Sequence, residues 1–237
     1  MPINGTSWLT RSNGADQPRL EAFELYRFYH SADDETAALR GVSLQLCAGE
    51  FVALLGPSGS GKSTLLACLA GLEEPDGGHV DLMGQRLSRR PEAVRAALRA
   101  RHIGMLMQSA NLFAHLTVEG NVTLQMLLAG TKDRIKLDAL LDVTGLAARR
   151  RAYRSQLSGG ETARAGLAVT LSAGHKVLLA DEPTAEVDAA TETVIVSHLV
   201  ERCHGNGDMA LIATHSDALA ARADRVLVIR DGRLVDA

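Results

Sequence analysis

The chain has 237 residues, of which 46% are apolar and 22% are charged, a balance typical of a globular protein with a hydrophobic core. Lysine and arginine number 25 against 28 aspartates and glutamates, so the net charge of −3 favours no nucleic-acid partner. No apolar run approaches the roughly 20 residues of a membrane span, and no basic segment leads into an apolar one at Met1, so we expect no signal peptide. The three cysteines show no metal-ligand spacing and are expected to be reduced, buried thiols (Cys47, Cys68 and Cys203).

Residues 1–20 are polar and lack periodicity, which predicts a flexible N-terminal arm before a domain over residues 21–237. An edge strand is expected over 23–29, and an alternating pattern predicts a second strand over 39–46. The run 51–55 is wholly apolar, as expected of a strand that is buried on both faces.

Strands and helices alternate along the rest of the chain. The expected strands are 79–83, 103–106, 177–180, 210–213 and a terminal hairpin of 225–229 with 233–235; the expected helices are 62–70, 91–100 and 189–202. Helical spacing over 117–151 predicts a helical subdomain, inserted at about 109–172. This alternation indicates an α/β fold with a mainly parallel core sheet and helices on both faces.

A glycine-rich segment joins the buried strand 51–55 to the helix after it. It matches the phosphate-binding pattern G-x-x-x-x-G-K-[ST] through Gly56, Pro57, Ser58, Gly59, Ser60, Gly61, Lys62, Ser63 and Thr64. The glycines allow backbone N–H groups to point inward at a polyphosphate, and the helix begins at its positive dipole end. Lys62 is expected to bridge the β- and γ-phosphates and Ser63 to bind Mg²⁺.

Two adjacent carboxylates follow the apolar strand 177–180, at the carboxyl end where open α/β sheets bind ligands. Asp181 is expected to hold Mg²⁺ through a water, and Glu182 to activate the attacking water as a general base. Taken alone, the pair is also compatible with a solvated strand end.

Further motifs, in order along the chain, identify a family. Leu157-Ser158-Gly159-Gly160-Glu161 resembles the LSGGQ signature of ABC-type ATPases, and Gln108 resembles the glutamine loop of that family. Asp181-Glu182-Pro183-Thr184, Asp188 and His215 match its next three elements. The resemblance covers roughly residues 22 to 235. It implies the ABC type of phosphate-loop NTPase fold, with an antiparallel β subdomain and an inserted helical subdomain.

The resemblance also implies ATP as substrate, Mg²⁺ as cofactor and roles for individual residues. Gln108 would join Ser63 and Asp181 at the metal, and His215 would position the γ-phosphate and the water near Glu182. Lys62, Gln108, Glu182 and His215 are thus the expected catalytic residues.

A dimer follows from the signature motif. Ser158 and Gly159 open a helix whose N-terminal N–H groups and hydroxyl form a second anion site. In the family this segment closes over the ATP of the partner, so the resemblance implies a head-to-tail dimer with Ser158, Gly159, Gly160, Glu161 and Asp188 at the nucleotide. Both half-sites look complete, which favours a homodimer, and a heterodimer is the alternative.

Aromatic residues make up only 3% of the chain, so the tyrosines near the N-terminus draw attention as contacts for adenine. Tyr29 matches the adenine-stacking position of the family through its spacing to Ala38-Leu39. Phe28 and Tyr26 are alternatives, and Tyr29 would otherwise pack on its strand.

Finer features resemble the lipoprotein-release, macrolide-export and cell-division subgroup, notably the segments 101–108 and 115–118. The chain departs from the family after the signature, where it keeps Arg164 but lacks a second arginine, and at Ala185-Glu186-Val187. Neither departure removes a group that hydrolysis needs.

Three function hypotheses remain open. The resemblance favours an ATPase subunit that sits at the cytoplasmic face of the cell membrane and powers a separate integral membrane permease, which exports or extracts a hydrophobic or amphipathic substrate. The alternatives are a mechanical or regulatory module that signals through a membrane partner, and a soluble ABC protein. The stripe of Leu124, Leu127 and Leu128 is expected to be helical core, or else a groove for a membrane partner. The arginines at 149–151 and between 86 and 101 are expected to form a solvated face or to meet an anionic partner.

Overall fold

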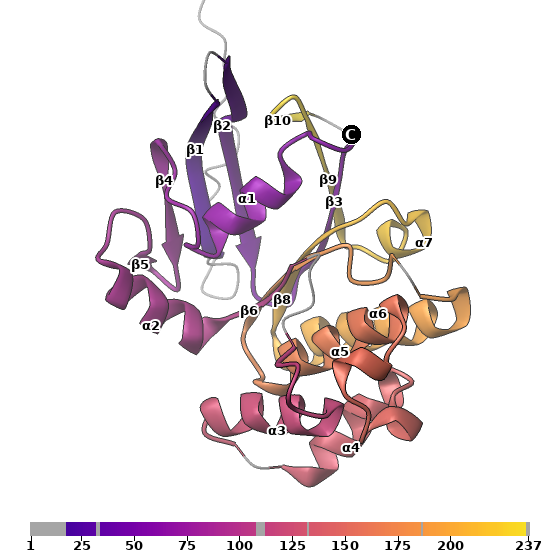
Figure 1. Ribbon diagram of the computed structural model, residues 1–237. Coiled ribbons are helices and arrows are strands. Elements are labelled where there is room, and N and C mark those ends of the chain that lie inside the picture. The colour runs from indigo at the N-terminus through magenta and orange to yellow at the C-terminus, as the bar shows by residue number, and fades with distance from the viewer. Residues whose placement is uncertain (1–17, 32–33, 108–111, 132, 186, 236–237) are drawn as a thin grey trace, which may run out of the picture.

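The computed structural model describes residues 18–31, 34–107, 112–131, 133–185 and 187–235 (Figure 1). No helix within these ranges is both long enough and apolar enough to cross a membrane. Of the expected site residues, Gln108 lies outside the described ranges, as do Glu186 and residues 1–17 of the expected arm.

A four-stranded antiparallel sheet forms one part of the fold, at the upper left of Figure 1. Its order is β2-β1-β4-β5, with β1 at Pro18–Ser31, β2 at Asp34–Cys47, β4 at Gly77–Leu82 and β5 at Gln85–Arg86. The expected edge strand is therefore wrong in position, because β1 pairs with β2 on one side and β4 on the other. The expected arm also ends earlier than residue 20, since Leu20 is fully buried within β1.

A six-stranded sheet forms the centre, in the order β10-β9-β3-β8-β7-β6. Its strands are β3 (Phe51–Leu55), β6 (Ile103–Leu106), β7 (Val177–Asp181), β8 (Met209–Ala213), β9 (Arg225–Arg230) and β10 (Arg233–Val235). All neighbours pair in parallel except β9 and β10, which form a hairpin through Asp231 and Gly232. Both turn residues have positive φ, as a two-residue hairpin turn requires. The expected α/β fold with a mainly parallel core sheet is confirmed.

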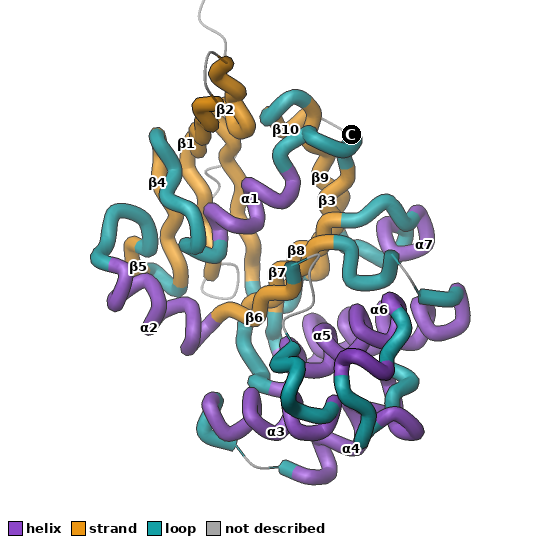
Figure 2. The backbone as a smooth tube through the Cα atoms, in the orientation of Figure 1, coloured by secondary structure: helices purple, strands orange, loops and turns teal. Residues whose placement is uncertain are grey.

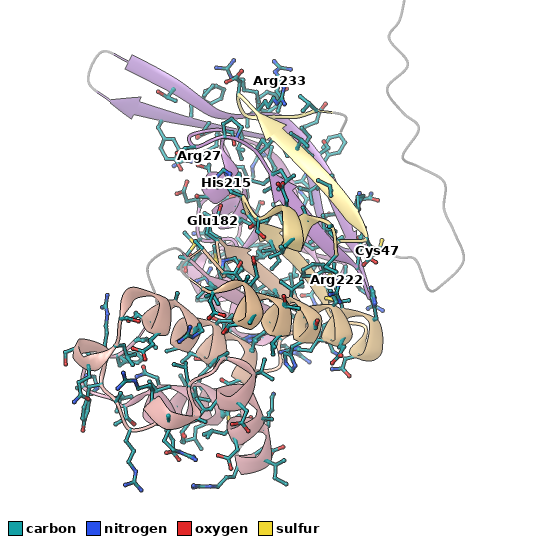
Figure 3. All side chains as sticks on the ribbon, turned by 90° about the vertical axis from the view of Figure 1, so that its right-hand side faces the viewer. Arg27, Cys47, Glu182, His215, Arg222 and Arg233 are labelled. Atoms are coloured by element: carbon teal, nitrogen blue, oxygen red, sulfur yellow. The ribbon has the colours of Figure 1, made fainter. Side chains whose placement is uncertain are left out.

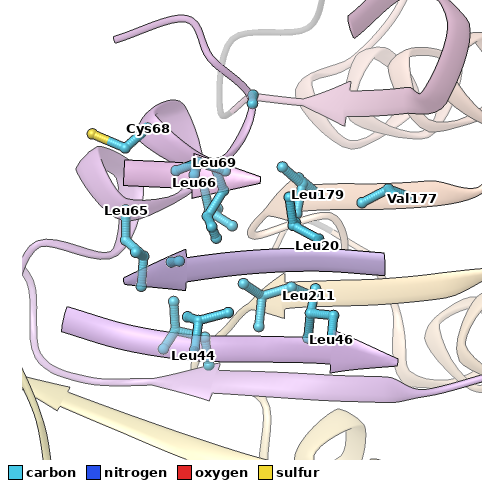
Figure 4. Close-up of a cluster of buried hydrophobic side chains, with 14 of the residues drawn as sticks. Leu20, Leu44, Leu46, Leu65, Leu66, Cys68, Leu69, Val177, Leu179 and Leu211 are labelled. Carbon is cyan, nitrogen blue, oxygen red and sulfur yellow. The ribbon is translucent and has the colours of Figure 1, made fainter. Parts of the chain in front are cut away.

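The two faces of this sheet carry separate cores, because alternate residues of each buried strand point to opposite sides. Val52 and Leu54 of β3 join the core that α1 (Lys62–Leu69) and the four-stranded sheet cover, part of which appears in Figure 4. Phe51 and Ala53 join the core on the opposite face, under helices. Continuous apolar strands are thus explained by burial on both sides, which holds their carboxyl ends rigidly in place.

Helices cover the second face and extend away from the sheet (Figure 2). Between β6 and β7 come α3 (Val118–Leu128), α4 (Arg134–Val143), two 3₁₀ turns (Ala147–Arg149 and Arg154–Gln156) and α5 (Gly159–Ser172). The other helices are α2 (Glu92–His102), α6 (Ala189–Asn206) and the short α7 (Asp217–Ala220). Side-chain oxygens cap α3, α4, α5, α6 and α7, which explains where these helices begin.

Two surface expectations are settled by side-chain positions. Leu127 and Leu128 are 52% and 73% exposed, so the expectation that they form core is wrong for both. The arginine run is largely paired within the chain: Arg149 pairs with Glu161, and Arg150 with Glu119 and Asp138. Two of the cysteines are buried as expected, and burial raises the pKa of both thiols to about 12 (Cys68 and Cys203).

Candidate nucleotide site

The loop between β3 and α1 is shaped by two glycines that accept no side chain. A Cβ on Gly56 would lie 2.3 Å from the Ile229 carbonyl oxygen, and one on Gly61 would lie 2.4 Å from that of Ala38. Gly61 also has a φ of 105°, in the left-handed region that favours glycine. It stands at the N-cap of α1, where no side chain accepts from the first N–H groups. The first turn of α1 is therefore free to receive an anion.

Lys62 brings the one ammonium group of this loop inside it. Its Nζ donates to the carbonyl oxygens of Gly56 at 2.6 Å and Pro57 at 3.1 Å, and the residue is only 8% exposed. The hydroxyl oxygen of Ser60 is buried nearby with no hydrogen-bond partner among the described residues. A positive charge is thus held within the loop, where a polyphosphate would enter.

The carboxyl end of β7 supplies a carboxylate to the same place. Asp181 is 6% exposed, and its Oδ2 accepts a hydrogen bond from the hydroxyl of Ser63 on α1. A hydroxyl and a carboxylate are the hard oxygen ligands that Mg²⁺ prefers. Across the described ranges, no three His, Cys, Asp or Glu side chains gather closely enough to bind a metal by themselves. The donor set therefore suits an ion that takes its other ligands from phosphate and water.

Glu182 follows Asp181 in an unusual backbone conformation, with a φ of 51° and an N–H that donates to the Ala213 carbonyl of β8 at 2.9 Å. Its Oε1 is buried without a hydrogen bond from any residue that the structure describes, and the Nε2 of His215 lies 3.4 Å away. The backbone N–H of His215 donates to the other carboxylate oxygen at 3.3 Å. Figure 3 labels these two residues side by side. The pair presents one carboxylate oxygen ready to accept a proton.

A cavity of about 860 Å³ joins these groups, a volume within the usual range for small-molecule sites. Of the expected residues it is lined by Ser58, Gly59, Gly61, Lys62, Ser63, Thr64, Asp181, Glu182 and His215. Gly56, Pro57 and Ser60 shape the loop but do not line the cavity. A further wall comes from Thr36, Ala37, Ala38 and Arg40 of β2 and from Asp231 and Gly232, which no sequence motif marks. Thr214 also lines the cavity and could have been found, since it stands directly before His215.

The signature segment lies at the start of α5 and contributes nothing to the lining of this cavity. The hydroxyl of Ser158 accepts from the Glu161 N–H at 3.2 Å, and the Glu161 carboxylate accepts from the Ser158 N–H at 2.9 Å. Glu161 also pairs with Arg149 at 2.8 Å. The Ser158 N–H first, and Arg149 second, lower the pKa of Glu161. This reciprocal cap makes the segment a finished helix terminus on the surface.

Comparison with known proteins agrees with this geometry. The sequence profile of the ABC transporter family matches residues 39–185, which is more than half of the chain. The chain belongs to the ABC transporter family. It is an ABC-type ATPase domain, and it binds ATP.

Individual relatives sharpen the assignment to a LolD- and MacB-like group. The lipoprotein-releasing system ATP-binding protein LolD of Hyphomonas neptunium is 38% identical over 223 residues, 93% of this chain and 98% of the relative. The macrolide export ATP-binding/permease protein MacB of Escherichia coli is 37% identical over 221 residues, 92% of this chain. The chain spans about a third of the length of that second relative, 34%.

Two solved structures resemble the whole fold. The dimeric structure of a bacterial ABC transporter cassette has a TM-score of 0.87 at 27% identity, covering 92% of this chain and 97% of that one. A dimeric post-hydrolysis structure of an ATP-binding cassette, bound to ADP and Pi, has a TM-score of 0.86 over the same coverage.

Tyr29 lies beside the ABC phosphate loop without lining its cavity. Its hydroxyl donates to Glu73 and lies 3.4 Å from the hydroxyl of Thr64, while the guanidinium of Arg27 lies over its ring, 4.8 Å from the centroid. Burial first, and the Glu73 carboxylate second, raise the pKa of Tyr29. The ring is 37% exposed, so its role at adenine stays a prediction.

Asp188 serves a structural purpose within the single chain, as the N-cap of α6. Its carboxylate accepts from the Thr191 N–H at 3.0 Å and from the Thr191 hydroxyl at 2.7 Å. The backbone bond first, and the hydroxyl second, lower the pKa of Asp188. The residue is exposed and does not line the cavity, so its expected contact with nucleotide also stays a prediction.

Proposed function

We propose that this chain hydrolyses Mg-ATP and powers a separate membrane permease, which exports or extracts a hydrophobic or amphipathic substrate. The observation that carries the hydrolytic part is the buried, unbonded Oε1 of Glu182 beside Lys62, Ser63 and Asp181 in one cavity. The substrate part rests on the relatives, since one is named for lipoprotein release and another for macrolide export.

Phosphate binding falls to the loop and to Lys62. The ammonium of Lys62 would leave the carbonyl oxygens of Gly56 and Pro57 and turn to the β- and γ-phosphates. Backbone N–H groups at the uncapped start of α1 would bind the remaining oxygens.

The Mg²⁺ site would use Ser63 directly and Asp181 through a water. The hydroxyl of Ser63 already lies against Asp181, so both oxygens are positioned before any ion arrives. When bound, Mg²⁺ would neutralise the charge that develops on the phosphate oxygens. Gln108, outside the described residues, is proposed as a further ligand from the resemblance alone.

Glu182 would take the proton of the attacking water. Its Oε1 receives no hydrogen bond from the described residues. The backbone N–H of His215 donates to Oε2, and this bond would fix the orientation of the carboxylate. The His215 imidazole, 60% exposed, would donate toward the γ-phosphate and the water. Glu182, after β7, would thus be the general base, and His215, after β8, its positioning group.

The complete site would need a second copy of this chain. Ser158, Gly159 and Gly160 form an exposed helix start outside the cavity, so a head-to-tail partner would have to bring them to the γ-phosphate. The similar cassettes that have been solved are dimeric, which supports this arrangement.

The permease would dock on the helical part of the fold, which would place the chain at the cytoplasmic face of the membrane. Phe113, Leu127 and Leu128 are 54%, 52% and 73% exposed there. A cavity of about 530 Å³ lies nearby between β6, α3 and α5. Exposed apolar side chains beside a groove suit an amphipathic helix of a partner.

Replacing Glu182 with glutamine tests the hydrolytic part. A general base contributes on the order of 10² to 10⁴ in rate, so steady-state ATP hydrolysis with the permease present should fall by about that factor. ATP binding should persist, because Lys62 and Ser63 are untouched. Glu201→Gln, a matched change at an exposed carboxylate of α6, should hydrolyse ATP at the wild-type rate. Unchanged turnover in Glu182→Gln would refute the assigned role.

Purification from membranes tests the coupling. A permease that co-purifies with the chain and stimulates its hydrolysis supports the proposal. A partner without a translocation pathway would instead favour the mechanical or regulatory alternative.

A further inference from the structure

A second charged cavity, of about 420 Å³, lies between α4, the segment before β7 and α6. It shares no lining residue with the nucleotide cavity. The helices α4 and α6 are in contact with each other. The charged and polar groups of its lining are Lys136, Lys176, His198, Arg202, Asn206 and Asp208.

The one carboxylate of this lining, that of Asp208, already accepts hydrogen bonds from two cations. Asp208 accepts from Lys176 at 2.9 Å through Oδ1 and from Arg202 at 2.8 Å through Oδ2. Arg202 also donates a hydrogen bond to the carbonyl oxygen of Leu171, at the end of α5. Two cations thus share one anion, and one positive charge is left over before Lys136 is considered.

Lys136 adds a second uncompensated charge. Within the part of the chain that the structure describes, its Nζ has no acceptor at hydrogen-bonding distance, although the residue is half-buried. The ammonium lies over Gly174, where a Cβ would approach it to 3.2 Å. Burial first, and the charge of Arg202 second, lower the pKa of Lys136, while Asp133 and Asp208 oppose this shift. An ammonium without a protein acceptor keeps all three of its donors for water or for an anion.

Two neutral donors complete the surroundings. His198 is half-buried on α6, and burial first, then Arg202, lower its pKa, which favours the neutral ring, and a neutral imidazole offers one N–H. Glu201 opposes that shift. The side-chain amide of Asn206 lines the same cavity and has no partner among the described residues.

We propose that this cavity binds a phosphate group, with Lys136 as its principal ligand and His198 and Asn206 as neutral donors. Within the lining, three cations face one carboxylate, an excess of two positive charges, which Asp133 and Glu201 outside the lining partly offset. A phosphate monoester, with roughly −1.5 to −2 charges at neutral pH, has the sign that this lining favours. A bound phosphate would connect α4, in the helical part, with α6, which packs on the core sheet.

The probe is inorganic phosphate at constant ionic strength, and the readout is the NMR signal of the His198 ring, assigned with His198→Gln. This signal is local, so phosphate that enters the nucleotide cavity does not disturb it. In the wild type it should shift and saturate as phosphate rises. Lys136→Gln should weaken the apparent affinity about tenfold or more, since a charge-assisted hydrogen bond is lost. Lys136→Met, which keeps the aliphatic stem, should do the same.

Arg134→Gln is the matched control, because it removes one positive charge from α4 at an exposed position outside the cavity. It should bind phosphate as the wild type does. A second arm replaces phosphate by vesicles of phosphatidic acid, a lipid with a phosphate monoester headgroup, with phosphatidylcholine as reference. A Lys136-dependent response to phosphatidic acid alone identifies a lipid headgroup, and a response to phosphate alone identifies a free anion.

A linear, unsaturated shift with both probes would overturn the proposal, as would equal affinity in Lys136→Gln and the wild type. Either result would leave the proposed ATPase function untouched, because the two cavities share no residue.

Discussion

The phosphate loop and the signature segment both lead into helix N-termini, yet they treat them in opposite ways. At α1 the N-cap is Gly61, and no side chain satisfies the first turn. At α5 the N-cap is Ser158, which forms a reciprocal cap with Glu161. The first terminus is enclosed in a cavity and keeps its donors for a ligand, whereas the second is exposed and needs no ligand to be stable. One chain thus carries a helix start with free donors at the nucleotide cavity and a capped helix start on its surface. We propose that the second completes the nucleotide site of another copy.

ATP binding at the N-terminus of α1 should be far more sensitive to substitution at Gly61 than at Gly59. Both glycines have positive φ, so alanine costs roughly 1–2 kcal/mol of backbone strain at either position. At Gly61 the new Cβ would also collide with the Ala38 carbonyl at 2.4 Å, whereas at Gly59 nothing lies within 4 Å. Gly61→Ala should therefore abolish ATP binding in an equilibrium titration, and Gly59→Ala should weaken it only modestly. Equal affinities would show that the close approach to β2 does not shape the loop.

The capped N-terminus of α5 should contribute to dimerisation, and not to nucleotide binding by a single chain. Ser158→Ala removes a helix cap, worth about 1 kcal/mol of stability, and leaves the cavity intact. Affinity for ATP should stay at the wild-type value, while ATP-dependent dimerisation, followed by light scattering, and hydrolysis should fall at least about tenfold.

Thr117→Ala is the control for the loss of a cap. Thr117 caps α3 by the same type of bond, to the Gly120 N–H at 3.1 Å, and lies outside the nucleotide cavity. It should lose comparable stability but still dimerise with ATP. Normal dimerisation in Ser158→Ala would refute the role of the signature segment at the partner.

The local pattern of the sequence predicted the buried strands well and their neighbours poorly. The apolar runs at β3, β7 and β8 announced burial on both faces, because each alternate side chain had to be apolar. The place of β1 between β2 and β4 was missed, since pairing partners depend on contacts between distant residues and not on alternation. Helical spacing at Leu127 and Leu128 likewise gave no information on which face is covered.

The site divides in the same way. The loop, Asp181, Glu182 and His215 could be predicted, because motifs place them at strand ends that meet at one edge of the sheet. The wall formed by Arg40 and Asp231 could not, since it arises where β2 and the β9–β10 hairpin meet in space. Neither the cover of Arg27 on the Tyr29 ring nor the cavity at Lys136 leaves a mark in the sequence.

A smaller effect is expected at Tyr29, which borders the loop without entering its cavity. If its ring stacks on adenine, Tyr29→Ala should lose roughly 0.5–1.5 kcal/mol, or about a two- to twelvefold rise in the Kd for ATP. Tyr29→Phe removes only the bonds to Glu73 and Thr64 and should bind ATP as the wild type does. Isothermal titration with ATP separates these outcomes. A Kd that rises equally in both variants would assign the effect to the hydroxyl and not to stacking.

The smallest effect concerns the charge of Glu161 in the first turn of α5. Glutamine at this position can keep the reciprocal cap, so Glu161→Gln should fold normally and lose only the ion pair with Arg149. The pKa of Glu161 is lowered in the folded chain, so its charge stabilises the fold above the ordinary carboxyl range and ceases to do so as pH falls through the lowered pKa. The difference in unfolding free energy between the wild type and Glu161→Gln, from urea titrations, should therefore be larger at about pH 7 than at about pH 4. Arg149→Gln should show the same difference and the double variant no further loss, because both changes break one pair. A difference that is independent of pH would mean that the cap, and not the charge, distinguishes glutamate from glutamine at this helix start.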